Sequence, residues 1–191
     1  MADYNAQLVD ELLVMDAQSG RVKAMEMLVS RWQKRLWRYA CRLTGDAEAA
    51  WDVTQEAWLA IVRGIARLND PARFRSWAFR IATNKANDWI RKNAYDPRPA
   101  PDPPAARPED TETTDELHTI LRRLPEKSRT VLTLYYLEEF ALADVARILR
   151  IPRGTVKSRL HTARAEFKEL WERRDHARPT DRPAFQEGDT K

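Results

Sequence analysis

The chain has 191 residues, and its 33 Lys and Arg side chains against 29 Asp and Glu side chains give a net charge of +4. This length allows one ordinary domain or two small ones. The charged fraction of 32% and the lack of any apolar run of about 18 residues predict no membrane insertion. A single cysteine, Cys41, and the scattered His118, His161 and His176 offer no metal-ligand spacing, so we expect neither metal nor cofactor.

The start of the chain and its glycine content exclude further classes. The first 20 residues carry four acidic and no basic side chains, which is the reverse of a secretory signal, so we expect a cytoplasmic protein. None of the five glycines forms a phosphate-binding loop, and no segment alternates with period two. We therefore expect an all-α fold. An enzyme is the least expected class, because no nucleophile, base and orienting group can be assembled.

Three strong helical patterns follow a weaker one over residues 6–16. Apolar residues at steps of three and four predict an amphipathic helix over residues 21–44, and Gly45 ends it at a position that favours glycine. Asp46 is placed to cap the second helix. Pro71, after Asp70, predicts the start of a third helical pattern that continues to about Lys92.

Asp52, Gln55 and Glu56 stand at i, i+3 and i+4 of the second predicted helix and so share one face. Three polar acceptors within a basic segment suit a basic partner helix. Judged by charge alone, an ordinary solvated helix face is the stronger interpretation.

Aromatic and cationic residues are interleaved in the third helical pattern, from Phe74 to Lys92. Single-stranded nucleic acid is bound by stacking on aromatic rings, worth roughly 1–3 kcal/mol per base, and by neutralisation of its phosphates. A single-strand contact is therefore one candidate function of this helix. The alternative is a core position, which we expect for most of the three aromatics Phe74, Trp77 and Trp89.

The small net charge conceals two basic segments with an acidic one between them. Residues 21–94 hold 15 basic and 7 acidic side chains (+8), residues 95–116 hold 2 and 7 (−5), and residues 141–174 hold 9 and 4 (+5). Six of the eleven prolines lie in the acidic segment and exclude helix or sheet interior there. We therefore expect two small helical domains at residues 1–94 and 117–174, a flexible, semi-extended linker at 95–116 and a disordered tail at 175–191.

The second domain is predicted to start a helix at Leu124-Pro125-Glu126 and to end in a helix-turn-helix. Small Ala146 stands where the two short helices approach, and Ile151 fills the turn between them. The spacing of 4, 3 and 4 predicts that Val156, Leu160, Ala163 and Phe167 form the buried stripe of the last helix. The opposite face is then free to enter a DNA major groove. The candidate contacts are Thr155, beside free amides that can bind a phosphate, and Lys157, Ser158, His161, Thr162 and Arg164. Without the motif, His161 would be an ordinary surface histidine.

Four motifs, in the same order along nearly the whole folded chain, resemble RNA polymerase sigma factors of the sigma-70 family. The resemblance is to its minimal two-domain members, the extracytoplasmic-function (ECF) group. The motifs are Asp52-x-x-Gln55-Glu56, Phe74-x-x-Trp77-x-x-Arg80-Ile81-Ala82-x-Asn84, Leu124-Pro125 and Ile151-Pro152-x-Gly154-Thr155-Val156-Lys157-Ser158-Arg159. The chain departs from the family at Thr162, where many relatives carry Arg, and in residues 68–73, which lack a common Gly. These departures bear on which promoter sequence the protein binds and not on the class of protein to which it belongs.

The resemblance implies a promoter-specificity subunit that binds core RNA polymerase and directs transcription initiation. Asp52, Gln55 and Glu56 would contact the coiled coil of the largest polymerase subunit. The minus-thirty-five promoter element would be bound as duplex by the second-domain contacts named above, and an anti-sigma factor is a further candidate partner. The minus-ten element would be bound as melted single strand by Asn69, Asp70, Arg73, Phe74, Trp77, Arg80, Asn84, Lys85 and Asp88.

Two other functions compete with this one. A sigma-mimic would sequester an anti-sigma protein without initiating transcription, but such mimics usually carry a receiver domain, for which we find no segment. A helix-turn-helix repressor would use the first domain for dimerisation or ligand binding, which gives the face of Asp52, Gln55 and Glu56 no role.

Overall fold

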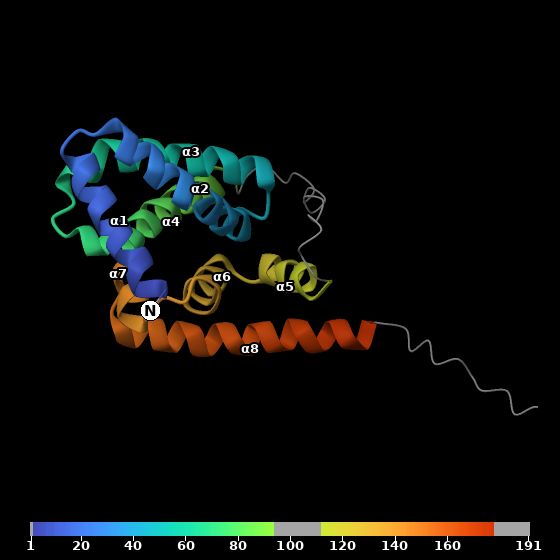
Figure 1. Cartoon of the computed structure of the whole chain (residues 1–191). Helices are drawn as coiled ribbons and strands as arrows, with labels where there is room; N and C mark the ends of the chain where they lie inside the picture. Colours follow the sequence, from blue (N-terminus) through green and yellow to red (C-terminus); the bar gives the residue numbers. More distant parts are fainter. Residues whose placement is uncertain (1, 94–111, 178–191) are drawn as a thin grey trace, which may run out of the picture.

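The computed structural model describes residues 2–93 and 112–177 (Figure 1). Every element in these ranges is helical, as the sequence predicts, and no described helix is long and apolar enough to cross a membrane. In chain order the elements are α1 (Ala2–Gln18), α2 (Val22–Thr44), α3 (Ala47–Gly64), η1 (Ile65–Arg67), η2 (Pro71–Arg73), α4 (Phe74–Asn93), α5 (Glu112–Arg123), α6 (Glu126–Leu132), η3 (Thr133–Leu137), α7 (Leu142–Leu149) and α8 (Arg153–Ala177). Of the short elements, η1 and η2 are 3₁₀ turns and η3 is a π-helical turn.

The turn between α2 and α3 has the caps that the sequence predicts. Gly45 adopts the left-handed conformation with φ 76°, and its N–H donates to the Cys41 carbonyl at 2.9 Å. The Asp46 side chain accepts from the Ala49 N–H at 2.8 Å and caps α3. The first helix, in contrast, extends beyond the predicted residues 6–16.

Helices α1 to α4 enclose the core of the first domain around α2. Leu28, Leu36 and Tyr39 of α2 are fully buried, and Phe79 of α4 packs on Tyr39 with ring centroids 4.8 Å apart. The Tyr39 hydroxyl lies 2.7 Å from Thr83 Oγ1, and burial raises the pKa of Tyr39. The tyrosine therefore joins α2 to α4 as a neutral group.

The second domain contains the predicted helix-turn-helix. Arg150 adopts the left-handed conformation (φ 53°) after α7, and the Ile151 N–H donates to the Ala146 carbonyl at 3.1 Å. Val156, Leu160 and Ala163 are buried, as the spacing predicts, whereas Phe167, the fourth predicted residue of the stripe, is only half-buried. Helix α8 forms the base of the molecule in Figure 1, with α5 and α6 between it and the first domain.

The observed helices differ from the predicted boundaries at two places. Helix α5 begins at Glu112, inside the range predicted as linker, and α8 continues to Ala177, past residue 174. Ile120 and Leu121 of α5 are buried. Residues 94–111 and 178–191, where the rest of the linker and tail were predicted, lie outside the described residues.

Candidate nucleic-acid interface

The outer face of α3 carries the first candidate set. Asp52, Gln55 and Glu56 are all exposed on it, as their spacing predicts. The same face carries large apolar side chains that are about half exposed: Trp51 (44%), Leu59 (55%) and Val62 (50%). Polar acceptors among exposed apolar groups are typical of a surface that docks another protein. The charge pattern of the sequence does not reveal these three residues, although a helical projection of α3 places them on that face.

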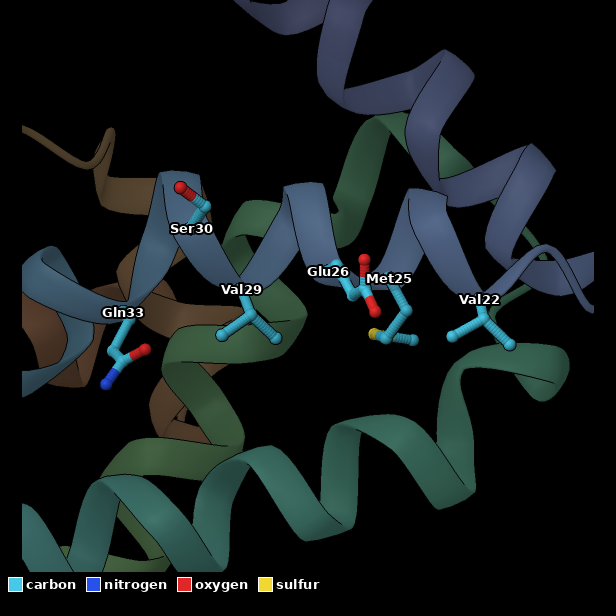
Figure 2. A pocket seen from close by; sticks show the side chains of 6 residues that line it. All are labelled: Val22, Met25, Glu26, Val29, Ser30 and Gln33. Carbon is cyan, nitrogen blue, oxygen red and sulfur yellow. The ribbon is translucent and has the colours of Figure 1, made fainter.

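A shallow groove runs along α2 near α3. Figure 2 shows Val22, Met25 and Val29 extending from α2 toward the neighbouring helix α3. The groove has a volume of about 470 Å³ and is lined by these three residues and Glu26, Ser30 and Gln33. The apolar surface of the first domain therefore extends over α2 as well as α3.

Helix α4 has two opposite faces with different surroundings. At 100° per residue, Trp77, Arg80, Asn84 and Asp88 lie on one side of the helix. Asn84 is exposed and the other three side chains are half-buried, so the structure brings these four predicted contacts together on an accessible face. The opposite side carries the buried Phe79, which faces the core and the second domain.

Phe74 is a core residue, so its predicted contact with DNA bases is wrong. Its side chain is 1% exposed, and its ring lies edge-on to Trp32 with centroids 5.9 Å apart. A ring enclosed in this way cannot offer a face to a base. Trp77 is only half-buried, and it packs so closely on Gly64 that a Cβ there would lie 3.0 Å from Trp77 Cζ2. Trp77 is thus a partly accessible aromatic residue held in a fixed position.

The turn before α4 is stabilised by its own acidic residue. Asp70 accepts from the Ala72 N–H at 3.1 Å, and its other carboxylate oxygen lies 2.9 Å from Arg73 Nε. Asn69, the third predicted contact in this turn, is exposed. Asp70 therefore caps η2 and orients Arg73, which is a structural role within the predicted interface.

An ion pair links the exposed face of α3 to α4. Lys85 Nζ lies 2.9 Å from Glu56 Oε2, and both side chains are partly exposed. Because the two residues are 29 positions apart, no helical spacing predicts the contact. The structure thus joins a candidate protein-binding residue to a candidate DNA-binding residue.

The outer face of α8 carries the second-domain candidates. Lys157, Ser158, His161, Thr162 and Arg164 are all exposed there, while Thr155 is half-buried at the helix start. The Ser158 hydroxyl donates to the Thr155 carbonyl at 3.1 Å. The helix therefore presents one continuous polar face of the kind that fits a major groove.

An aromatic residue that our sequence analysis did not select borders this face. The Arg164 guanidinium lies 5.9 Å from the ring centroid of Tyr136, a half-exposed tyrosine of η3. The contact is a cation–π interaction that orients Arg164 without neutralising it. Tyr136 is 28 residues away in the chain, so only the packing of η3 against α8 reveals it.

A buried carboxylate joins the two domains. Glu138 is 2% exposed, and its carboxylate oxygens lie 2.8 Å from Arg35 Nε and Arg42 Nη1 of α2. Burial lowers the pKa of Arg42, an effect that the charge of Glu138 opposes. No sequence signal predicts this cluster, because its members are about a hundred residues apart.

The described residues hold no cluster of three or more His, Cys, Asp or Glu side chains that could bind a metal ion. The thiol of Cys41 is largely buried in α2, and its burial raises its pKa to about 12. The cysteine is therefore protonated at neutral pH and suits a packing role.

Comparison with family models places two known regions on the chain. The model described as Sigma-70 region 2 matches residues 28–95, which include α3 and α4. The model described as Sigma-70, region 4 matches residues 114–167, which include the helix-turn-helix. Each matched region contains one of the two candidate DNA-binding faces.

Curated relatives match over most of their length. The chain is 31% identical over 174 residues to RNA polymerase sigma-H factor of Pseudomonas aeruginosa. The alignment covers 81% of this chain and 90% of the relative. It is 32% identical over 178 residues to ECF RNA polymerase sigma-E factor of Haemophilus influenzae. That alignment covers 83% of this chain and 93% of the relative.

Solved structures have the same fold. CnrH, in its complex with the cytosolic domain of CnrY, aligns with a TM-score of 0.69 and 27% identity over 86% of this chain and 98% of that chain. The sigma factor RpoE of Bartonella quintana, in complex with the anti-sigma factor NepR, aligns with a TM-score of 0.68 over 79% and 98%. Its identity of 21% supports the fold alone.

Proposed function

The chain belongs to the ECF group of the sigma-70 family of RNA polymerase sigma factors, and we propose that it binds promoter DNA in two forms. The second domain binds the minus-thirty-five element as duplex, and the first domain binds the melted minus-ten element as a single strand. The observation that carries this proposal is the pair of accessible polar faces, one on α4 and one on α8, each in a different matched region of the family.

The face of α3 is the proposed contact with core polymerase. Asp52, Gln55 and Glu56 supply acceptors for a basic partner helix, and the exposed Leu59 and Val62 supply apolar area between two helices. Glu56 already forms an ion pair with Lys85 of the same chain, and this pair holds the Glu56 carboxylate at the surface of α3. A basic coiled coil is the kind of partner that this surface fits.

Helix α4 and the turn before it are the proposed single-strand contact. Trp77 offers a partly accessible ring for stacking, and Arg73 and Arg80 offer charge for phosphates. Asn69, Asn84, Lys85 and Asp88 complete the surface, and Asp70 positions the turn. Phe74 is left out of the proposed contact because it is buried.

Helix α8 is the proposed duplex contact. The residues that would face the major groove are Lys157, Ser158, His161, Thr162 and Arg164. Thr155 and the amides of the helix start would bind a phosphate of the same duplex. Duplex suits this domain because an exposed helix fits the major groove of B-DNA.

Binding energy alone can hold the DNA open. Melting DNA costs about 1.4 kcal/mol per base-pair step, and stacking returns roughly 1–3 kcal/mol per base. A few bound bases together with phosphate contacts offset the melting of a short segment. We therefore propose an initiation factor that works without ATP and is not an enzyme. It would act in the cytoplasm, where core polymerase and promoters are found.

An anti-sigma factor is a further proposed partner. One structural relative is described as a sigma factor bound to the anti-sigma factor NepR. The half-exposed apolar side chains of α3 and the groove on α2 offer the kind of surface that a second protein covers. Such a partner would compete with core polymerase for the first domain.

Run-off transcription tests the proposed function. Purified protein is added to core polymerase on genomic promoter fragments, and transcripts are mapped. We expect start sites that appear only when the protein is present. If no start-site-specific transcript forms under any condition, including with protein freed of inhibitors, the proposal is wrong and a sigma-mimic or a repressor becomes the better account.

A further inference from the structure

We propose that Glu138 is a latch that holds the two domains of the free protein together and that must open before both promoter elements can be bound. This inference rests on the proposed function only for the need to open. The closed state itself follows from contacts between the domains.

The latch is an acidic residue enclosed by arginines of the other domain. Glu138 Oε2 lies 2.8 Å from Arg35 Nε, and Glu138 Oε1 lies 2.8 Å from Arg42 Nη1. The Glu138 carbonyl also accepts from Arg75 of α4. One residue of the second domain thus contacts three cations on two helices of the first. Buried, charge-assisted hydrogen bonds of this kind depend on every partner being present.

Aromatic packing surrounds the ion pairs. Phe140 is 5% exposed, and its ring meets that of Phe79 edge to face with centroids 5.0 Å apart. The Arg75 guanidinium lies 4.4 Å from the Phe140 ring centroid. These contacts exclude water from one side of the cluster, which strengthens the charge interactions at Glu138.

The backbone around Glu138 is unusual in a way that serves this contact. The π-helical turn η3 (Thr133–Leu137) ends immediately before it, and Glu139 has a φ of 54°, which is rare for a residue other than glycine. Such turns and conformations are frequent at functional sites. Here they end the helix so that Glu138 and Phe140 both face the first domain.

The latch leaves both proposed DNA faces uncovered. Arg75 and Phe79 lie on the side of α4 opposite Trp77 and Asn84. The groove-facing candidates of α8 from Lys157 to Arg164 are exposed in the closed state. The closed state therefore limits the distance between the two faces but not access to either one.

That distance is too short for a whole promoter. Elements centred at minus ten and minus thirty-five are about 25 base pairs apart, which is about 85 Å of B-DNA. A compact chain of this length has a radius of gyration of about 16 Å and thus a diameter of roughly 40 Å. Contact with both elements at once requires the domains to separate. The contacts of the latch at Glu138 must therefore be lost.

Small-angle X-ray scattering of the full chain without DNA tests the latch. In Glu138→Gln, a neutral amide of the same shape replaces the carboxylate, and we expect the ratio of closed to open molecules to fall about tenfold or more. The measured radius of gyration should then be larger than that of the wild type. The matched control is Glu139→Gln, which makes the same change at the exposed neighbouring residue and should leave the radius at the wild-type value.

A second variant separates opening from misfolding. Arg35→Gln removes one partner from the first domain, where its side chain is 40% exposed, and leaves the second domain unchanged. It should also raise the radius of gyration, with the helical circular dichroism of the wild type retained. Wild-type radii for both Glu138→Gln and Arg35→Gln would overturn the latch, and so would equal opening by Glu139→Gln. Because the measurement needs neither DNA nor polymerase, its failure is distinct from a failure in run-off transcription.

Discussion

The two proposed DNA-binding surfaces differ in how their cations are held before DNA arrives. In the first domain, two of the three proposed cations, Arg73, Arg80 and Lys85, are paired: Lys85 with Glu56 at 2.9 Å and Arg73 with Asp70 at 2.9 Å. In the second domain, Lys157 forms no ion pair with any described residue, and Arg164 contacts the ring of Tyr136. A cation that is already paired must exchange one partner for another and gains less from a phosphate. Lys157 can neutralise a phosphate in full and release its counterions.

The difference suits the two forms of DNA. Single strands are flexible, so a surface with cations fixed by internal carboxylates presents a defined path for the strand. Duplex is stiff and highly charged, so unpaired cations on one exposed helix gain the most from it. The four predictions below test this comparison or the contact between the two domains, from the largest expected effect to the smallest.

The largest effect is expected for Glu56→Lys, which reverses one of the two negative charges of the α3 face. The new lysine would repel Lys85 in place of the present ion pair, and it would also repel a basic partner helix. Affinity for core polymerase should therefore fall by about 30-fold or more. The measurement is binding of purified core polymerase. The control is Glu169→Lys, which changes another ion-paired, exposed glutamate, in α8. Unchanged core affinity in a folded Glu56→Lys protein would refute the assigned face.

Lys157→Ala should weaken binding to promoter duplex about tenfold and lower the salt dependence by about one phosphate contact. Affinity for core polymerase should change little. The matched control is Lys168→Ala, which removes an exposed lysine of α8 that lies 3.6 Å from Glu172. Equal binding to promoters with and without the upstream element would contradict the assignment of α8 to the groove.

Gly45→Ala should destabilise the protein by about 1–2 kcal/mol because an L residue is strained at φ 76°. The new Cβ would also lie 3.2 Å from Arg122 Cδ of α5, so the loss should exceed that of Gly20→Ala. Gly20 has a φ of 83° but no atom within 4 Å of the added Cβ, which makes it the matched control. Thermal unfolding of both variants measures the difference. Equal losses would mean that Arg122 moves aside and that α5 does not depend on this close approach.

The smallest effect is expected for Lys85→Gln, with a loss of less than about threefold in affinity for single-stranded promoter DNA. The reason is the existing pair with Glu56, which already offsets the charge of Lys85. Arg80→Gln, on the same helix, is the comparison variant and should lose more. A Lys85→Gln loss as large as that of Lys157→Ala would show that internal pairing does not weaken the first surface.

Much of the fold and of the site followed from local patterns. The caps at Gly45 and Asp46 and the buried stripe of α8 depend on neighbours within about one helical turn. The structure confirms both caps and three of the four predicted stripe residues. The same short range explains the shared faces of Asp52, Gln55 and Glu56 and of the α8 candidates, because a helix fixes which residues point the same way. Burial depends on how distant helices pack and not on neighbouring residues alone. Phe74 therefore matches the sequence pattern of an aromatic nucleic-acid contact although it is a core residue.

The sequence by itself determined the helices, the two basic segments with an acidic segment between them, and the family. Helical periodicity, proline and charge act over short stretches of chain. Only the tertiary structure decided which charges meet. The pair of Lys85 and Glu56 and the cluster around Glu138 join residues about 30 and 100 positions apart, and their energies depend on distance in space and on burial. Neither quantity is available before the helices are packed.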